Sequence, residues 1–125
     1  MMQYFLSLGS NINAEANVIF AIEQLNKILT NTKFSSIHKT KAEGFEGDDF
    51  LNLVVAGESD LSFDDLNKKL KDIENESGRK RDVPKFSART LDIDIVLQID
   101  EDEILFESDE IEKYSFVSEP LKEVL

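Results

Sequence analysis

The chain has 125 residues, of which 41% are hydrophobic and 32% charged, so it is expected to form one soluble globular domain spanning residues 1–125. Its net charge of −12 argues against a general nucleic-acid binder, which would need a basic face. The sequence contains no cysteine and one histidine, which excludes disulfides and thiolate metal sites and disfavours zinc.

The N-terminus does not have the pattern of a targeting segment. The first nine residues have no basic stretch, and their short apolar run ends at Ser7, which is wrong for a signal peptide. No apolar run approaches the length that spans a bilayer. We therefore expect a cytoplasmic protein with no membrane partner, and a monomer or weak dimer.

The first half of the chain predicts three strands and one helix. Residues 4–8 form an apolar strand that ends at a Gly-Ser-Asn turn. Apolar residues at positions 18, 22, 25 and 29 predict a helix with Asn13 as its N-cap. Residues 33–40 and 50–56 are predicted strands, joined by a loop over 41–49 that is long enough to carry function.

The second half predicts a helix followed by strands. Ser62, with Asp65 three residues later, resembles a capping box, and the apolar stripe that follows ends before Gly78. Residues 91–97 are a predicted fourth strand, 104–106 a short edge strand, and 116–125 a final helix or irregular tail. The order β-α-β-β-α-β predicts an α+β, ferredoxin-like antiparallel sheet with two helices packed on one face.

Asp92 and Asp94 are the strongest local indication of chemistry. Residues two apart in a strand point the same way, with α-carbons about 6.5–7 Å apart, so two carboxylates should lie side by side. Such ligands suit Mg²⁺, whose remaining positions are filled by water and by substrate phosphate oxygens. An isolated D-x-D pattern is also typical of the solvated face of an edge strand, and that interpretation stays open.

A basic segment lies directly upstream of this pair. Five basic residues fall between positions 79 and 89 with a single acid, whereas positions 100–112 hold eight acids and no base. Arg79, Arg81 and Arg89 have planar forks that suit phosphate oxygens, and an anion site beside a metal site is typical of phosphoryl transfer. Basic residues after a helix also complement its dipole without further function. P-loop and dinucleotide-binding glycine motifs are absent from the sequence.

The third predicted strand offers a candidate recognition surface. Phe50, Asn52 and Val54 should share one of its faces. An aromatic ring beside an amide can stack on a flat heterocycle and read its polar edge, although ordinary packing also explains the pair. His38 is isolated in a strand pattern and is assigned no role.

Taken together, these segments resemble the 6-hydroxymethyl-7,8-dihydropterin pyrophosphokinase family. The matching residues occur in family order between residue 4 and about residue 98: Leu8-Gly9-Ser10-Asn11, Thr40 with Gly44, Phe50-Leu51-Asn52, Ile73-Glu74 with Gly78-Arg79-Lys80-Arg81, and Arg89-Thr90-Leu91-Asp92-Ile93-Asp94.

The resemblance implies transfer of the β,γ-pyrophosphoryl group of ATP to the hydroxymethyl oxygen of 6-hydroxymethyl-7,8-dihydropterin, with release of AMP, in folate biosynthesis. It implies that Asp92 and Asp94 bind two Mg²⁺ ions with ATP, and that Asp92 lies near the attacking hydroxyl. Catalysis would consist of alignment and charge neutralisation.

The resemblance also implies two binding sites and a catalytic set. The ATP site would consist of Glu74, Arg79, Arg81 and Arg89. The residues expected to act in catalysis are Arg79, Arg89 and Asp94. The pterin pocket would consist of Thr40, Gly44, Phe50, Asn52, Asp92 and Phe116.

Two segments depart from the family pattern. Phe86-Ser87-Ala88 stands where the family usually has Trp-Gly-Pro before its arginine. Residues 107–114 contain neither the histidine nor the arginine that the family places after the sheet. These departures leave open a catalytically impaired pterin- or nucleotide-binding module with a regulatory role. A third interpretation is an unrelated ferredoxin-like interaction domain whose acidic segment binds a basic partner.

Overall fold

The computed structural model describes residues 1–41, 49–78 and 91–125 of the chain. The sheet is antiparallel, with strand order β2-β4-β1-β5-β6, and β3 also pairs with β4. The elements in chain order are β1 (Met2–Ser10), α1 (Ala14–Ile28), β2 (Thr30–Phe34), β3 (His38–Thr40), β4 (Phe50–Ser59), α2 (Phe63–Glu76), β5 (Asp92–Asp100), β6 (Glu103–Glu107), α3 (Glu110–Lys113) and α4 (Ser115–Val124).

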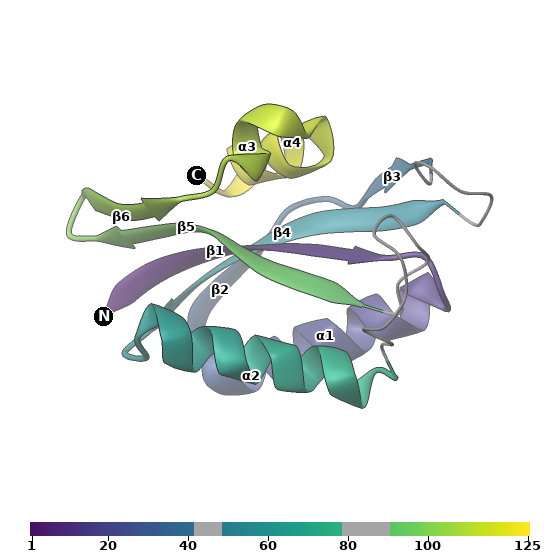
Figure 1. The fold of residues 1–125 in the computed structure, drawn as a ribbon, viewed down its shortest axis with the longest axis horizontal. Coiled ribbons are helices and arrows are strands. Elements are labelled where there is room, and N and C mark those ends of the chain that lie inside the picture. Colours follow the sequence, from purple (N-terminus) through teal and green to yellow (C-terminus); the bar gives the residue numbers. More distant parts are fainter. Residues whose placement is uncertain (42–48, 79–90) are drawn as a thin grey trace.

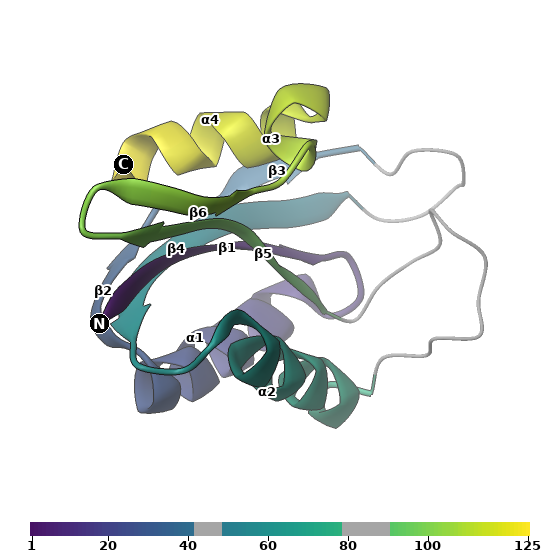
Figure 2. The same ribbon diagram turned by 60° about the vertical axis from the view of Figure 1, so that its left-hand side comes forward.

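The predicted α+β, ferredoxin-like class is confirmed. The βαββαβ order and the antiparallel pairing of β1 with both β4 and β5 are those of that fold. Helices α1 and α2 cover one face of the sheet, and α3 and α4 lie on the other (Figure 1). A view turned by 60° shows the same three layers (Figure 2). The additions to the predicted unit are β6, α3 and α4.

Alternating residues give the sheet two apolar faces. On β1, Leu6 and Leu8 belong to the core beneath α1 and α2, whereas Phe5 belongs to the core beneath α4. On β4, Leu53 faces the first core and Val54 the second, so the predicted division of this strand into two faces is confirmed. Burial on both sides fixes the register, because a one-residue slip would exchange the two faces.

The predicted second strand over 33–40 is wrong as one continuous element. The structure divides it into β2 and β3, which pair with different parts of β4. Between them the Ser35 N–H donates to the Val54 carbonyl at 2.9 Å, and the Val54 N–H donates to the Ser35 hydroxyl at 2.9 Å. A side chain therefore replaces one backbone acceptor of the ladder, and the edge strand breaks there.

Both predicted N-cap residues occupy the N-cap position of their helix, but only one of them caps through its side chain. The Ser62 hydroxyl accepts from the Asp65 N–H at 3.2 Å and caps α2 as predicted. Asn13 does occupy the N-cap position of α1, but its backbone is left-handed (φ 46°) and its side chain makes no capping bond. Residue type alone did not reveal that conformation. None of the helices in the described part of the chain is long and apolar enough to cross a bilayer.

Residues 116–125 were predicted as a helix or an irregular tail, and the structure forms helix α4 there. Hydrogen bonds from Ser36 and His38 to Glu123 join this helix to the connection between β2 and β3. Glu123 accepts hydrogen bonds from the Ser36 N–H at 2.9 Å and the Ser36 hydroxyl at 3.0 Å, and its carboxylate lies 2.6 Å from His38 Nε2. Bonds from the Ser36 backbone and from the His38 and Ser36 side chains lower the pKa of Glu123 from 4.5 to about 2. His38, to which the strand pattern gives no role, is thus part of a structural tether.

We expect Glu123→Gln to destabilise the protein at neutral pH and to lose that effect in acid. A carboxyl group whose pKa is lowered on folding stabilises the folded state above its unfolded pKa, here 4.5, and loses that contribution as the pH falls toward about 2. Urea unfolding of both proteins between pH 7 and pH 3 measures the difference. Glu119→Gln, on the same helix, is the matched control. A difference that stays constant over this pH range would contradict the assignment.

Candidate active site

The predicted site residues in the described segments lie mainly where β1 ends and where β4 and β5 begin. These strand ends gather at the right-hand side of Figure 1, away from both chain termini. In the antiparallel register, Gly9 of β1 pairs with Asn52 of β4 on one side and with Asp92 of β5 on the other. Residues distant in sequence therefore form a short row across three strands.

Three carboxylates converge at the β5 end of this row. One carboxylate oxygen from each of Glu74, Asp92 and Asp94 lies within 4.8 Å of the others. The two aspartates come from alternate positions of β5, as the strand pattern predicts, while Glu74 reaches them from the last turn of α2. We call these three residues the carboxylate cluster.

Glu74 is fully buried, and its carboxylate bonds the part of β5 that has no neighbouring strand among the described residues. Strand β6 pairs with β5 only from Leu97 to Asp100, so within the described residues no strand lies beside positions 92–95 on that side. The Ile93 N–H donates to Glu74 Oε2 at 2.7 Å instead. A helix side chain thus satisfies a backbone donor that a neighbouring strand would otherwise bond.

Lys71 places a cation inside the cluster. Its Nζ lies 3.2 Å from Glu74 Oε2, 3.3 Å from Asp94 Oδ1 and 3.3 Å from the Ile93 carbonyl oxygen. Lys71 and Glu74 are three residues apart on α2 and therefore share one helix face. Sequence reasoning missed Lys71. The three-residue spacing from Glu74, which was assigned to the site, is the signal that could have identified Lys71.

Burial and neighbouring negative charges raise the pKa of carboxyl groups in and beside the cluster. Burial and the charge of Asp92 raise the pKa of Asp94 to about 6, and Lys71 partly offsets that rise. Glu110 of α3 also contributes, and its own pKa is raised by burial and by the charge of Asp92. Sequence reasoning counted Glu110 only as part of an acidic segment. The fold brings it within electrostatic range of the two aspartates.

The donor set fits a hard divalent cation. Carboxylate oxygens are the ligands that Mg²⁺ prefers, and two oxygens bound to one ion at 2.0–2.1 Å lie at most about 4.2 Å apart. The carboxylate oxygens lie within 4.8 Å of one another, so only small side-chain rotations are needed to meet that limit. Asp92 and Asp94 are partly exposed, whereas Glu74 is fully buried, so the aspartates are the accessible residues suited to hold the ion.

The other end of the row carries the predicted heterocycle-binding residues. Asn52 is buried, and its Nδ2 donates to the Thr40 hydroxyl at 2.7 Å and to the His38 carbonyl at 3.4 Å. Phe50 pairs with Thr40 in the β3–β4 ladder and lies on the same side of β4 as Asn52. The structure therefore brings three of the predicted pocket residues together.

Gly9 lies between the two groups of residues in the sheet. A β-carbon built on it would lie 3.2 Å from Asn52 Oδ1 and 3.8 Å from the Phe50 ring. Adjacent strands lie about 4.8 Å apart, so the backbones of Asn52 and Asp92 are separated by roughly 10 Å with Gly9 between them.

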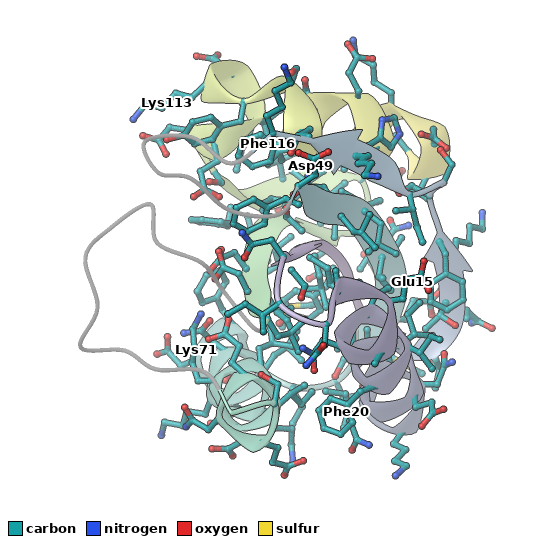
Figure 3. The ribbon with its side chains drawn as sticks, turned by 90° about the vertical axis from the view of Figure 1, so that its right-hand side faces the viewer. Glu15, Phe20, Asp49, Lys71, Lys113 and Phe116 are labelled. Atoms are coloured by element: carbon teal, nitrogen blue, oxygen red, sulfur yellow. The ribbon has the colours of Figure 1, made fainter. Side chains whose placement is uncertain are left out.

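Phe116, the remaining pocket residue in the described segments, lies on α4. Its ring stacks on Tyr114 with centroids 4.8 Å apart, and it packs against the core beneath α4. Figure 3 labels Phe116 on the side of α4 that faces the sheet. Its ring is thus engaged with a neighbouring aromatic residue of the C-terminal segment, and its stacking role on a heterocycle stays a prediction.

Four predicted site residues lie outside the described residues. They are Gly44, Arg79, Arg81 and Arg89. The segments on either side are described, with Gly78 following α2 and Leu91 preceding β5. The expected roles of the three arginines in ATP binding and catalysis therefore stay predictions.

Comparison with known proteins identifies the family. Residues 5–125 match the family described as 7,8-dihydro-6-hydroxymethylpterin-pyrophosphokinase (HPPK). Three similar bacterial proteins share the name 2-amino-4-hydroxy-6-hydroxymethyldihydropteridine pyrophosphokinase. The Aquifex aeolicus protein is 40% identical over 103 residues, which are 81% of this chain and 64% of the relative.

The other two relatives show a similar likeness. The Bacillus subtilis protein is 32% identical over 128 residues, covering 96% of this chain and 76% of the relative. The Haemophilus influenzae protein is 37% identical over 101 residues, covering 78% of this chain and 62% of the relative. The aligned regions thus span between three fifths and about three quarters of these relatives' lengths. The chain belongs to the 7,8-dihydro-6-hydroxymethylpterin-pyrophosphokinase family.

Proposed function

We propose that this protein transfers the β,γ-pyrophosphoryl group of ATP to 6-hydroxymethyl-7,8-dihydropterin, as a Mg²⁺-dependent diphosphokinase of folate biosynthesis in the cytoplasm. The hydroxymethyl oxygen forms a bond to the β-phosphorus, the bond from that phosphorus to the oxygen bridging to the α-phosphate breaks, and AMP leaves. The hydroxyl proton is lost during this exchange. The products are AMP and the pterin diphosphate.

One observation carries the proposal. Asn52, Gly9 and Asp92 lie in a single row across β4, β1 and β5, so the predicted heterocycle-binding residues beside Asn52 and the carboxylate cluster that includes Asp92 stand on either side of Gly9. A pterin whose ring edge bonds Asn52 and whose ring lies along Gly9 would direct its hydroxymethyl group toward Asp92. The acceptor oxygen and the phosphate-bound metal would then meet at one place, which is the alignment that phosphoryl transfer needs.

Residues of the chain would position the pterin and hold the metal ions. Phe50 would stack on the pterin, and Asn52, held by Thr40, would present Oδ1 to its polar edge. Asp92 and Asp94 would hold the metal ions, while Glu74 keeps β5 in place through the Ile93 N–H. Bound magnesium would neutralise phosphate charge and orient the triphosphate. Arg79 and Arg89 would act on the transferred group, and Arg81 would support nucleotide binding.

The direct test is AMP formation by the purified protein. We expect AMP to appear only when ATP, Mg²⁺ and 6-hydroxymethyl-7,8-dihydropterin are all present, in equal amounts with the pterin diphosphate. Omission of the pterin should leave ATP intact, because no acceptor oxygen is available. Saturable pterin binding with no AMP at saturating Mg²⁺ and ATP would reject the proposed activity and favour a binding module without turnover.

Gly9→Ala should weaken pterin binding while leaving the protein folded. The added methyl group meets Asn52 Oδ1 at 3.2 Å, which is tight enough to displace the amide from its recognition position. We expect roughly a tenfold rise in the pterin Kd and a loss of stability of about 1 kcal/mol or less. Calorimetric titration with pterin and urea unfolding measure the two effects.

Gly57→Ala is the matched control for this change. Gly57 lies on β4, five residues from Asn52, and a β-carbon there would meet Leu29 at 3.0 Å. This substitution should destabilise the protein and leave the pterin Kd unchanged. An equal effect of both substitutions on pterin affinity would show that Gly9 acts through general stability and not through the pocket.

A further inference from the structure

Lys71 is a charged residue of the site to which neither the strand pattern nor the proposed function gives a role. It lies about one-third exposed on α2, and its Nζ bridges Glu74 Oε2 at 3.2 Å and Asp94 Oδ1 at 3.3 Å. Figure 3 labels it at the part of α2 that approaches the sheet. The ammonium group therefore partly neutralises two members of the cluster.

A divalent ion bound to Asp94 would share that oxygen with the ammonium group. An ion at about 2.1 Å from Asp94 Oδ1 would lie no more than about 5.4 Å from Lys71 Nζ, since Nζ is 3.3 Å from the same oxygen. Two positive charges at that distance repel each other. Metal alone must therefore bind against Lys71, or must displace it from Asp94.

A bound triphosphate changes this balance. It brings several negative charges to the metal, so an ammonium group released from Asp94 would find phosphate oxygens as new partners. Glu74, three residues along α2, contacts the same ammonium group at 3.2 Å and would keep it in this region. Release from Asp94 would then cost little when nucleotide is present and much more when it is absent.

We propose that Lys71 makes metal binding conditional on nucleotide: its ammonium group pairs with Asp94 and would transfer to a phosphate oxygen when metal and triphosphate bind together. The inference rests on the proposed use of a metal-bound nucleoside triphosphate. It assigns Lys71 as a positioning residue that selects metal bound to triphosphate over metal alone.

Lys71→Met tests this role because it keeps most of the aliphatic stem and removes the charge. We expect the variant to bind Mn²⁺ alone at least about tenfold more tightly than the parent protein. We expect it to bind Mg²⁺ together with a non-hydrolysable ATP analogue about tenfold more weakly, because the phosphate loses a cation. Electron paramagnetic resonance of Mn²⁺ and calorimetry of the analogue give the two constants without any turnover.

Three further variants test whether the effect comes from the charge of Lys71. Lys71→Arg keeps the positive charge and should retain the parent order of affinities. Lys68→Met makes the same change in net charge at an exposed position of α2 and should alter neither constant. Lys71→Gln repeats the neutralisation with a polar side chain, and thermal melting shows that each variant is folded.

Opposite changes of the two affinities support the proposal, because a residue that only maintains the fold would weaken both. Weakening of both, no change in either, or no measurable binding of Mn²⁺ alone to the neutral variants overturns it. The binding measurements contain no pterin. Opposite changes in a protein that forms no AMP would therefore uphold the role of Lys71 while rejecting the proposed activity.

Discussion

Asp94→Asn is expected to reduce the rate of AMP formation by roughly a thousandfold or more, because it removes a carboxylate proposed to hold metal against the triphosphate. The amide has nearly the same shape but no charge, so the loss would reflect electrostatics and not packing. A steady-state assay with saturating ATP, Mg²⁺ and pterin measures kcat. Asp100→Asn, at the opposite end of β5, is the control and should retain full activity.

The same variant should fold at least as well as the parent protein. Burial and the charge of Asp92 raise the pKa of Asp94 to about 6, so at pH 8 the metal-free folded state holds an ionised group that it disfavours. Replacing it with a neutral amide removes that cost. Thermal melting with a chelator at pH 8 should give an equal or higher Tm. Turnover within tenfold of the parent would reject Asp94 as a metal-holding residue.

Glu74→Ala should cause the largest loss of stability of any single substitution considered for this protein. It leaves the Ile93 N–H without its 2.7 Å acceptor, takes one carboxylate partner from Lys71 and opens a cavity at a fully buried position. We expect the free energy of unfolding to fall by about 3 kcal/mol. Urea unfolding monitored by circular dichroism measures this loss.

Glu74→Gln and Glu76→Ala separate the causes. The glutamine keeps a side-chain oxygen that can accept from the Ile93 N–H, so it should restore much of the lost stability while removing the charge. Glu76 lies two residues further along α2 and is exposed, so its truncation should change stability by less than about 0.5 kcal/mol. If Glu74→Ala costs less than about 1 kcal/mol, the carboxylate does not stabilise the β5 edge.

The structure shows a structural role for Glu74 in addition to its predicted nucleotide role. The family resemblance placed this residue in the ATP site, and the fold engages its Oε2 with both Ile93 and Lys71. A direct contact with nucleotide stays a prediction. The structural contribution is separate from any contact with ATP. Measuring both ATP binding and the free energy of unfolding for the parent, Glu74→Gln and Glu74→Ala proteins distinguishes the two effects.

Hydrophobic periodicity predicted the order of the strands and helices in the ferredoxin-like unit because it depends on short-range alternation. The same alternation correctly placed Phe50 with Asn52, and Asp92 with Asp94, on shared strand faces. It failed where a local hydrogen bond divided the predicted second strand, and it did not reveal an unusual backbone angle. The break at Ser35 and the left-handed backbone at Asn13 depend on atoms that periodicity does not describe.

The sequence alone determined which chemical groups this protein has: a D-x-D pair on a strand, an aromatic–amide pair on another strand and a neighbouring basic segment. Tertiary structure decided which of the groups in the described segments meet. Only the strand register set Asn52, Gly9 and Asp92 in one row, and only the packing of α2 against β5 brought Lys71 and Glu74 to Asp94. The physical reason is that such contacts join residues far apart in the chain. The burial of two apolar sheet faces sets the distances between these residues, and no local sequence pattern does so.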